Sequence, residues 1–152
     1  MKCYRIIGAV MVVCLMVLSP CSGAFAASPG QVATYQPGLS RAADGFFGGA
    51  ELQIGLDREV PYRVFTLSKP DRLVVDFQEV VWTDFDPALY VALDNVIGAR
   101  VGLFEPGWSR MVLDLAAPSM VDRVEMAREG EGVAVRLNLA SVDRAAFDAA
   151  AG

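Results

Sequence analysis

The sequence contains no histidine, and this absence excludes several common kinds of active site. A catalytic zinc site normally takes two or three histidine ligands, usually with a carboxylate. Catalytic arrangements of the Ser-His-Asp and Cys-His types use a histidine as their general base. A pair of carboxylates is still open as a catalytic device, since glycoside hydrolysis needs only two acids, but no spacing in the chain brings two acids together. The candidates by residue type are Asp76, Glu79, Asp84, Asp86 and Asp114.

Cysteine is scarce as well, and all three cysteines lie within the first 21 residues. The same stretch has the order of a secretory signal peptide. Lys2 and Arg5 give it a positive start, residues 6–18 form an uncharged apolar run, and Ala24-Phe25-Ala26 offers small residues for cleavage after Ala26. The apolar run of 13 residues is shorter than the ~20 residues that cross a bilayer.

Two other interpretations of this N-terminus are an uncleaved membrane anchor and a lipoprotein signal that ends at Cys21. Pro20 fits poorly in front of a lipid-attachment cysteine, because that position normally holds a small residue. We therefore predict export out of the cytoplasm, cleavage after Ala26, and no stable membrane span in the mature chain.

Cleavage would leave about 126 residues (152 minus 26), enough for one domain with a single core. Such a domain would have no cysteine and would fold without disulfides, even in an oxidising compartment. Removal of Lys2 and Arg5 would take the net charge from −5 to −7. An acidic chain without clustered Lys and Arg is a poor candidate for binding nucleic acid or an anionic membrane.

The chain after the signal peptide divides into three segments. Residues 27–49 carry prolines and glycines with little apolar periodicity, which predicts a flexible lead-in. Residues 50–140 consist of short alternating runs separated by turn signals, interrupted at 84–95 by an irregular connection with one helical turn. The alanine-rich residues 141–152 are either a short helix or the start of a linker. The predicted strands cover residues 52–56, 61–67, 72–78, 97–104, 110–116, 120–127 and 132–140.

A short repeat is the most informative feature of the predicted strands. Arg72–Phe77 (RLVVDF) is matched position by position by Arg110–Leu115 (RMVLDL), and a looser match relates residues 52–77 to 111–139. Two three-stranded meanders, each with one apolar face, would bury those faces against each other. The predicted fold is therefore all-β, a small sandwich of two similar antiparallel meander sheets. Chance similarity between meanders is the alternative explanation of the longer match.

Alternation along the repeated strands places their Arg and Asp residues on the face opposite the apolar one. The simpler interpretation is that these charges are solvated or form weak cross-strand pairs. The alternative is a polar ligand-binding face.

Aromatic residues near turns supply further candidates for ligand contacts. Trp82 and Trp108 lie in or beside turns, and Tyr90 lies in the long connection. Exposed flat rings can stack on sugars, and a rim of arginines (Arg63, Arg100 and Arg110) could pair with the carboxylates of an acidic glycan or peptide. The alternative is that each tryptophan caps an open end of the sandwich. The predicted ligand-binding residues are Trp82, Tyr90, Arg100, Trp108 and Arg110, with no catalytic and no metal-binding residue.

Two motifs carry a resemblance to a known family. Residues 70–77 contain the pattern Pro-x-Arg-apolar-apolar-apolar-Asp, and residues 101–115 contain a glycine-bearing strand and turn followed by Arg-apolar-Val-apolar-Asp-apolar. With these motifs, residues 50–140 resemble an AMIN domain, the periplasmic module of N-acetylmuramoyl-L-alanine amidases and of some secretins.

The resemblance implies two symmetry-related β-sheets, a location in the periplasm and binding of peptidoglycan. It also implies that the domain targets an amidase to the cell envelope or division site, for cell-wall turnover and cell separation. Zinc and catalysis would then belong to an amidase domain absent from this sequence, and no cofactor is expected in the chain itself. Expected partners are peptidoglycan and envelope or division-site proteins. The alternative is a protein-interaction domain of a secretin or pilus assembly.

Overall fold

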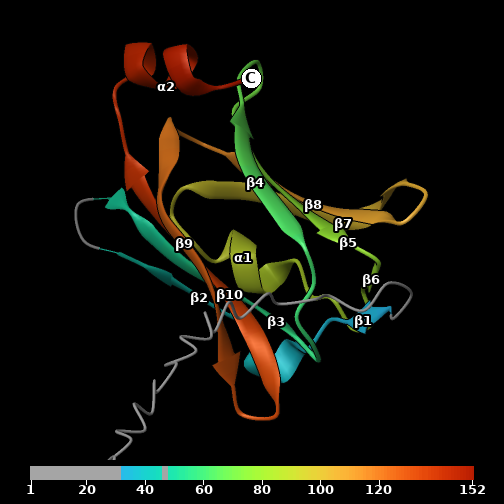
Figure 1. The fold of residues 1–152 in the computed structure, drawn as a ribbon. Helices are drawn as coiled ribbons and strands as arrows, with labels where there is room; N and C mark the ends of the chain where they lie inside the picture. The colour runs from blue at the N-terminus through green and yellow to red at the C-terminus, as the bar shows by residue number, and fades with distance from the viewer. Residues whose placement is uncertain (1–31, 46–47) are drawn as a thin grey trace, which may run out of the picture.

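The computed structural model describes residues 32–45 and 48–152. The predicted signal peptide, its cleavage after Ala26 and the first part of the lead-in lie outside the described residues. The described chain is mostly β-structure, arranged as two four-stranded antiparallel sheets that pack on each other (Figure 1). This confirms the predicted all-β sandwich. Of the helices in the described ranges, none has the length and apolar character to cross a membrane.

Each sheet is built from two hairpins whose second strands lie side by side at its centre. The first sheet has the order β2-β3-β10-β9 and the second the order β4-β5-β8-β7. The strands of the first sheet are β2 (Arg41–Asp44), β3 (Ala50–Leu56), β9 (Ser119–Glu129) and β10 (Gly132–Ser141). Those of the second are β4 (Tyr62–Leu67), β5 (Arg72–Gln78), β7 (Val96–Glu105) and β8 (Trp108–Leu115).

The pairing of the strands differs from the predicted meanders. The meander placed residues 52–56 in one sheet with 61–67 and 72–78, whereas β3 lies in the first sheet and β4 and β5 lie in the second. The physical reason is that a strand has two edges, and both edges of β3 are occupied, by β2 and by β10. The repeated hexamers are likewise antiparallel neighbours within the second sheet, β5 and β8.

The segment predicted as a flexible lead-in contains regular structure where the chain is described. It forms β1 (Ala33–Thr34), which pairs in parallel with β6 (Val80–Val81), then the 3₁₀-helix η1 (Pro37–Leu39) and β2. Gly55 allows η1 to lie directly on β3, since a Cβ there would come within 2.5 Å of the Leu39 Cβ. Proline and glycine therefore serve a tight turn and a close contact here, and the ordered fold starts before residue 50.

The core lies between the two sheets, and the predicted apolar faces of the repeated strands line it. The residues that β5 and β8 contribute are buried in one cluster with alternate residues of β3 and β10. From the second sheet these are Leu73, Val75, Phe77, Met111, Leu113 and Leu115, and from the first sheet Leu52, Ile54, Leu56, Val133, Val135, Leu137 and Leu139.

The helices close the ends and sides of the sandwich. The short helix α1 (Ala88–Val91), predicted as one helical turn, contacts β7 of the second sheet and β2 of the first. The tail forms the helix α2 (Arg144–Ala150), in which Asp143 accepts a hydrogen bond as N-cap and Phe147 is fully buried. Arg144 of α2 donates two hydrogen bonds of 2.7 Å to the carboxylate of Asp71, in the turn before β5.

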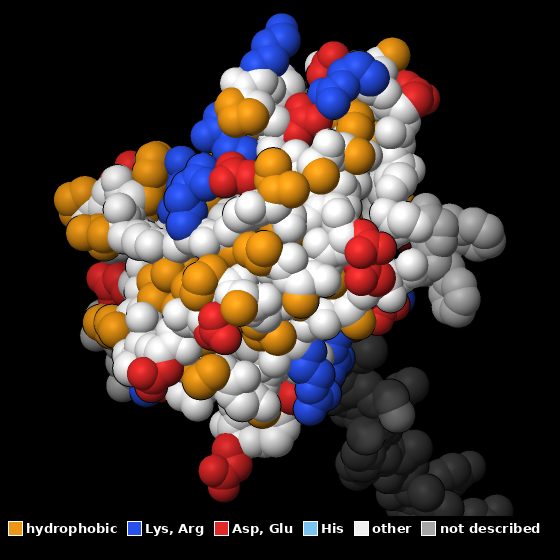
Figure 2. All heavy atoms as spheres, turned by 180° about the vertical axis from the view of Figure 1, so that it is seen from behind, with side chains coloured by type: hydrophobic (Ala, Val, Ile, Leu, Met, Phe, Trp, Pro, Cys, Tyr) orange, Lys and Arg blue, Asp and Glu red, His pale blue; other side chains and the backbone are white. Residues whose placement is uncertain are grey.

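The surface mixes charged and apolar side chains, as the view from behind shows (Figure 2). Three of the large apolar residues most exposed to solvent, Ile97, Leu103 and Phe104, belong to β7. Since β7 is an edge strand of the second sheet, its outer edge is accessible along much of its length.

Leu113→Ala tests the core between the sheets. We expect it to lower the free energy of unfolding by ~2–5 kcal/mol, because it leaves a cavity among buried neighbours. The matched control is Leu103→Ala on the adjacent strand, where the side chain is 79% exposed and the expected change is below about 0.5 kcal/mol. Urea unfolding measures both, and similar losses for the two variants would contradict this placement of the core.

Asp71→Asn tests the attachment of α2 through its dependence on pH. The hydrogen bonds from Arg144 lower the pKa of Asp71 below its ordinary value of 3.8. A carboxylate with a lowered pKa stabilises the fold above that ordinary value, and the stabilisation is lost as the pH falls through the lowered pKa. We expect Asp71→Asn to be less stable than the wild type near neutral pH and equally stable at low pH.

Urea unfolding at neutral pH and at low pH measures this difference. Asp148→Asn is the control, because Asp148 also faces Arg144 but lies at 3.5 Å and is more exposed. A stability gap between Asp71→Asn and the wild type that did not change with pH would count against the ion pair.

Candidate ligand-binding face

The outward side of the second sheet, which we call the arginine face, carries three rows of side chains. The strand register places one residue of each strand in every row, in the order β4, β5, β8, β7. The rows are Arg63–Asp76–Arg110–Gly102, then Phe65–Val74–Val112–Arg100, then Leu67–Arg72–Asp114–Gly98. Trp108, two residues before Arg110 on β8, continues the same face beyond the first row.

Asp76 is the centre of the first row, and its side chain is only 1% exposed. Arg110 donates from Nε to Oδ1 at 2.6 Å and from Nη2 to Oδ2 at 3.0 Å, and Arg63 donates to Oδ2 at 3.2 Å. A buried carboxylate is costly unless such donors satisfy it. The hydrogen bonds with Asp76 raise the pKa of Arg110 above its ordinary value, so Arg110 is charged at any physiological pH.

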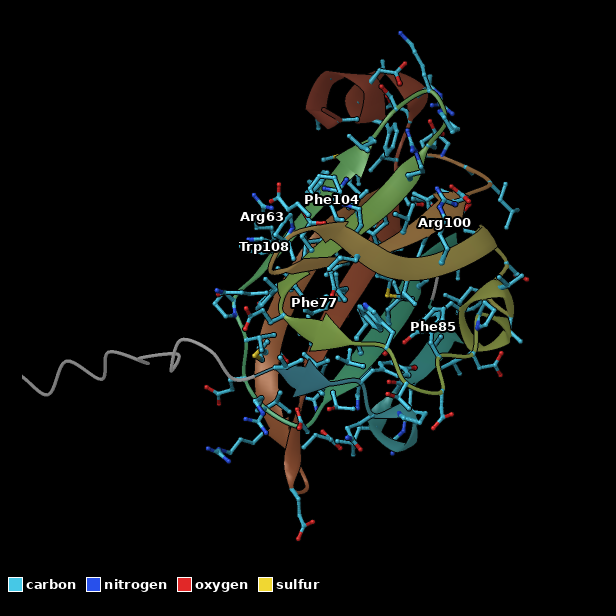
Figure 3. All side chains as sticks on the ribbon, turned by 90° about the vertical axis from the view of Figure 1, so that its right-hand side faces the viewer. Arg63, Phe77, Phe85, Arg100, Phe104 and Trp108 are labelled. Atoms are coloured by element: carbon cyan, nitrogen blue, oxygen red, sulfur yellow. The ribbon has the colours of Figure 1, made fainter. Side chains whose placement is uncertain are left out.

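The guanidinium groups of Arg63 and Arg110 each lie over an aromatic ring. The guanidinium of Arg63 lies 4.3 Å from the centroid of the Trp108 ring, and that of Arg110 lies 3.4 Å from the centroid of the Phe104 ring. Figure 3 shows Arg63, Phe104 and Trp108 grouped at one end of the sheet. Cation–π contacts of this kind contribute ~0.5–1 kcal/mol at exposed sites. Charge and flat apolar surface are thus fixed side by side.

Arg100 forms a second ion pair on the same face, one row further along. Its guanidinium donates to the carboxylate of Asp114, which is more exposed than Asp76. A row of an antiparallel sheet is about 7 Å from the next, so Arg100 and Arg110 are near neighbours on this face. Figure 3 shows Arg100 along the sheet from the group around Arg63.

The structure brings together three of the five predicted ligand-binding residues. Arg100, Trp108 and Arg110 share the arginine face. The interpretation of the repeated charges as cross-strand pairs applies to Asp76 and Arg110, which are directly opposed and hydrogen-bonded. The interpretation as a polar face describes the arginine face as a whole.

Trp82 and Tyr90 lie elsewhere, in an aromatic cluster at one side of the core. Tyr90 is fully buried, its hydroxyl lies 3.4 Å from that of Tyr35, and desolvation raises its pKa. The prediction of an exposed Tyr90 ring is therefore wrong. The Trp82 ring packs 5.6 Å from Phe77 and 5.8 Å from Phe85, which agrees with the alternative that this tryptophan covers the sandwich core.

Sequence reasoning missed Asp76 as the centre of the site and Phe104 as a ring on it. The signal for Asp76 was present in the repeat, because antiparallel neighbours with the same Arg-x-x-x-Asp pattern bring Arg of one strand opposite Asp of the other. Phe104 lies where the register between β7 and β8 shifts, a local irregularity that alternation does not reveal. In residues 32–45 and 48–152, no group of three or more His, Cys, Asp or Glu side chains is placed to hold a metal ion.

Comparison with known families finds a match to part of the chain. Residues 30–79 match the family described as AMIN-like domain, a match that runs through β1 to β5 and includes the proline-arginine motif of β5. The match confirms the resemblance through its first motif and extends into the segment before residue 50, while the second motif, at residues 101–115, lies outside the match. AMIN-like domains are generally associated with peptidoglycan binding in the cell envelope. None of the curated proteins compared with the chain matches it.

Arg110 and Arg63 donate different numbers of hydrogen bonds to Asp76, and this difference gives a stability prediction. We expect Arg110→Ala to lower the free energy of unfolding by ~2–4 kcal/mol, because Asp76 would keep one donor for a buried charge. Arg63→Ala should cost less than about 1 kcal/mol, since Arg63 is half exposed and gives one longer hydrogen bond. Urea unfolding of both variants measures the difference, and equal losses would contradict the assigned geometry.

Proposed function

We propose that this domain binds peptidoglycan in the periplasm through the arginine face. In this proposal the bound domain targets a zinc-dependent N-acetylmuramoyl-L-alanine amidase to the cell wall, for turnover and cell separation. The domain itself acts by binding, and zinc and amide hydrolysis belong to the amidase domain, which is not in this sequence. The AMIN-like match supports the class of ligand.

The observation that carries the proposal is the fixed combination of arginines and rings around Asp76. Phe104 is 48% exposed, so much of its surface is open to a ligand. A flat apolar ring offers a surface on which a sugar can stack, and a planar guanidinium pairs with carboxylate in a defined geometry. Peptidoglycan presents both partners, sugar rings in its glycan strands and carboxylates in its peptides.

One observation favours the second candidate, a protein-interaction domain of a secretin or pilus assembly in the envelope. The edge strand β7 carries exposed apolar residues at both ends, Ile97 and Leu103. Exposed strand edges of this kind bind partner chains by strand addition. In that case the partner would pair along β7 and would not need the rings of the arginine face.

Pull-down with purified sacculi tests the leading proposal. We expect the wild-type protein to sediment with sacculi, and Phe104→Ala and Trp108→Ala each to weaken binding about fivefold or more, as loss of ~1 kcal/mol requires. Arg123→Ala is the matched control, because Arg123 is 68% exposed on β9 of the other sheet and should bind normally.

Two results would argue against the proposal. A wild-type protein that stays in the supernatant would rule out peptidoglycan as its ligand. Wild-type binding together with unchanged binding by Phe104→Ala and Trp108→Ala would move the site away from the arginine face.

A further inference from the structure

Gly102 leaves a gap between the side chains of the arginine face, which we call the notch. It lies directly opposite Arg110 in the register of β7 and β8, with Arg100 and Phe104 two residues away on either side. A Cβ placed on Gly102 would meet no atom within 4 Å. By contrast, a Cβ on Gly98, the other glycine of this face, would come within 2.9 Å of the Asp114 carboxylate. The space at Gly102 is therefore open where the space at Gly98 is filled.

The groups around the notch are donors of hydrogen bonds. Arg110 directs Nε and Nη2 to Asp76, which leaves its Nη1 without a partner among the described residues. Arg100 uses Nη1 on Asp114 and is half exposed. A guanidinium has five N–H donors and no acceptor, so both arginines have donors to spare for a ligand that brings acceptors.

The charge of the face points to the same class of ligand. The outward rows and the adjoining turn hold four arginines, Arg63, Arg72, Arg100 and Arg110, against three carboxylates, Asp76, Glu105 and Asp114. The chain as a whole has a net charge of −5. The arginine face thus has an excess of one positive charge on an acidic protein, which disfavours a cation there and tolerates an anion.

We propose that the notch at Gly102 takes a carboxylate, so that binding to peptidoglycan depends on the carboxylates of its peptides as well as on the sugars that stack on the rings. This inference rests on the proposed function above. The carboxylate would lie between Arg110 and Arg100 and would accept a hydrogen bond from a spare donor of each guanidinium. Phe104 would shield one side of the pair from water and thereby strengthen the attraction.

Gly102→Val tests the notch without disturbing the arginines. Gly102 does not have a positive φ and its Cβ position is empty, and β-branched residues suit strands, so the fold should be retained. We expect an unchanged or raised melting temperature and at least about a tenfold loss of binding to sacculi, since the added side chain fills the space. Gly38→Ala is the control, because its Cβ position is also empty but lies in η1, and both properties should stay unchanged.

Chemically modified sacculi test the class of ligand with the wild-type protein alone. One sample has its free carboxylates converted to amides, and a second consists of glycan strands from which the peptides have been removed and whose freed lactyl carboxylates have also been converted to amides. We expect binding to both to fall about tenfold or more relative to native sacculi, because neither offers the charge that the arginines complement.

The outcomes separate this inference from the proposed function. Equal binding to native and amidated sacculi would overturn the carboxylate assignment and leave peptidoglycan binding intact. Normal binding by a folded Gly102→Val would overturn the notch as the site. Absence of wild-type binding to every sample would overturn both proposals.

Discussion

The arginine face depends on one constraint, the burial of the Asp76 carboxylate in the outward side of a sheet. A carboxylate at 1% exposure must be satisfied by charged donors, and Arg63 and Arg110 provide them from the two flanking strands. Those hydrogen bonds fix both guanidinium groups, and the guanidinium groups fix the rings of Trp108 and Phe104. The interaction surface is therefore organised from a buried charge outward.

The repeat explains why an aspartate lies opposite an arginine on the outward side of the sheet. The neighbouring strands explain why only one of the two aspartates of the repeat, Asp76, is fully buried. In the antiparallel pair of β5 and β8, Asp76 faces Arg110 and Arg72 faces Asp114. Only the first of these pairs is hydrogen-bonded among the described residues, since Arg72 donates to the Pro70 carbonyl and Asp114 accepts from Arg100. On the edge strands, Arg63 of β4 lies opposite Asp76, whereas Gly98 of β7 lies opposite Asp114. Similar strands thus differ because their edge partners differ.

Local patterns in the sequence predicted the seven longest strands, the helical turn and the buried faces, because alternation and turn residues act over a few positions. They missed β1, β2 and β6, which are short. They did not predict which strands pair, since the choice of β10 and not β4 beside β3 depends on residues 77 or more positions away, as in Leu56 and Val133. The same limit applies to the site. Trp82 and Trp108 look alike in sequence, and only the packing of Tyr35, Phe77 and Phe85 around Trp82 separates a core ring from a surface one.

The fold also determines which surface is available for binding. The inward faces of both sheets form the core, and η1 lies on the outward side of the first sheet at Gly55. The outward side of the second sheet is left with long polar side chains, of which Asp76 already holds Arg63 and Arg110 in place. Ordering a free arginine on binding costs about 0.5–1.5 kcal/mol, so side chains fixed in advance retain more of the interaction energy. A weakly basic patch on an acidic domain can therefore bind a carboxylate selectively, because its donors are positioned before the ligand arrives.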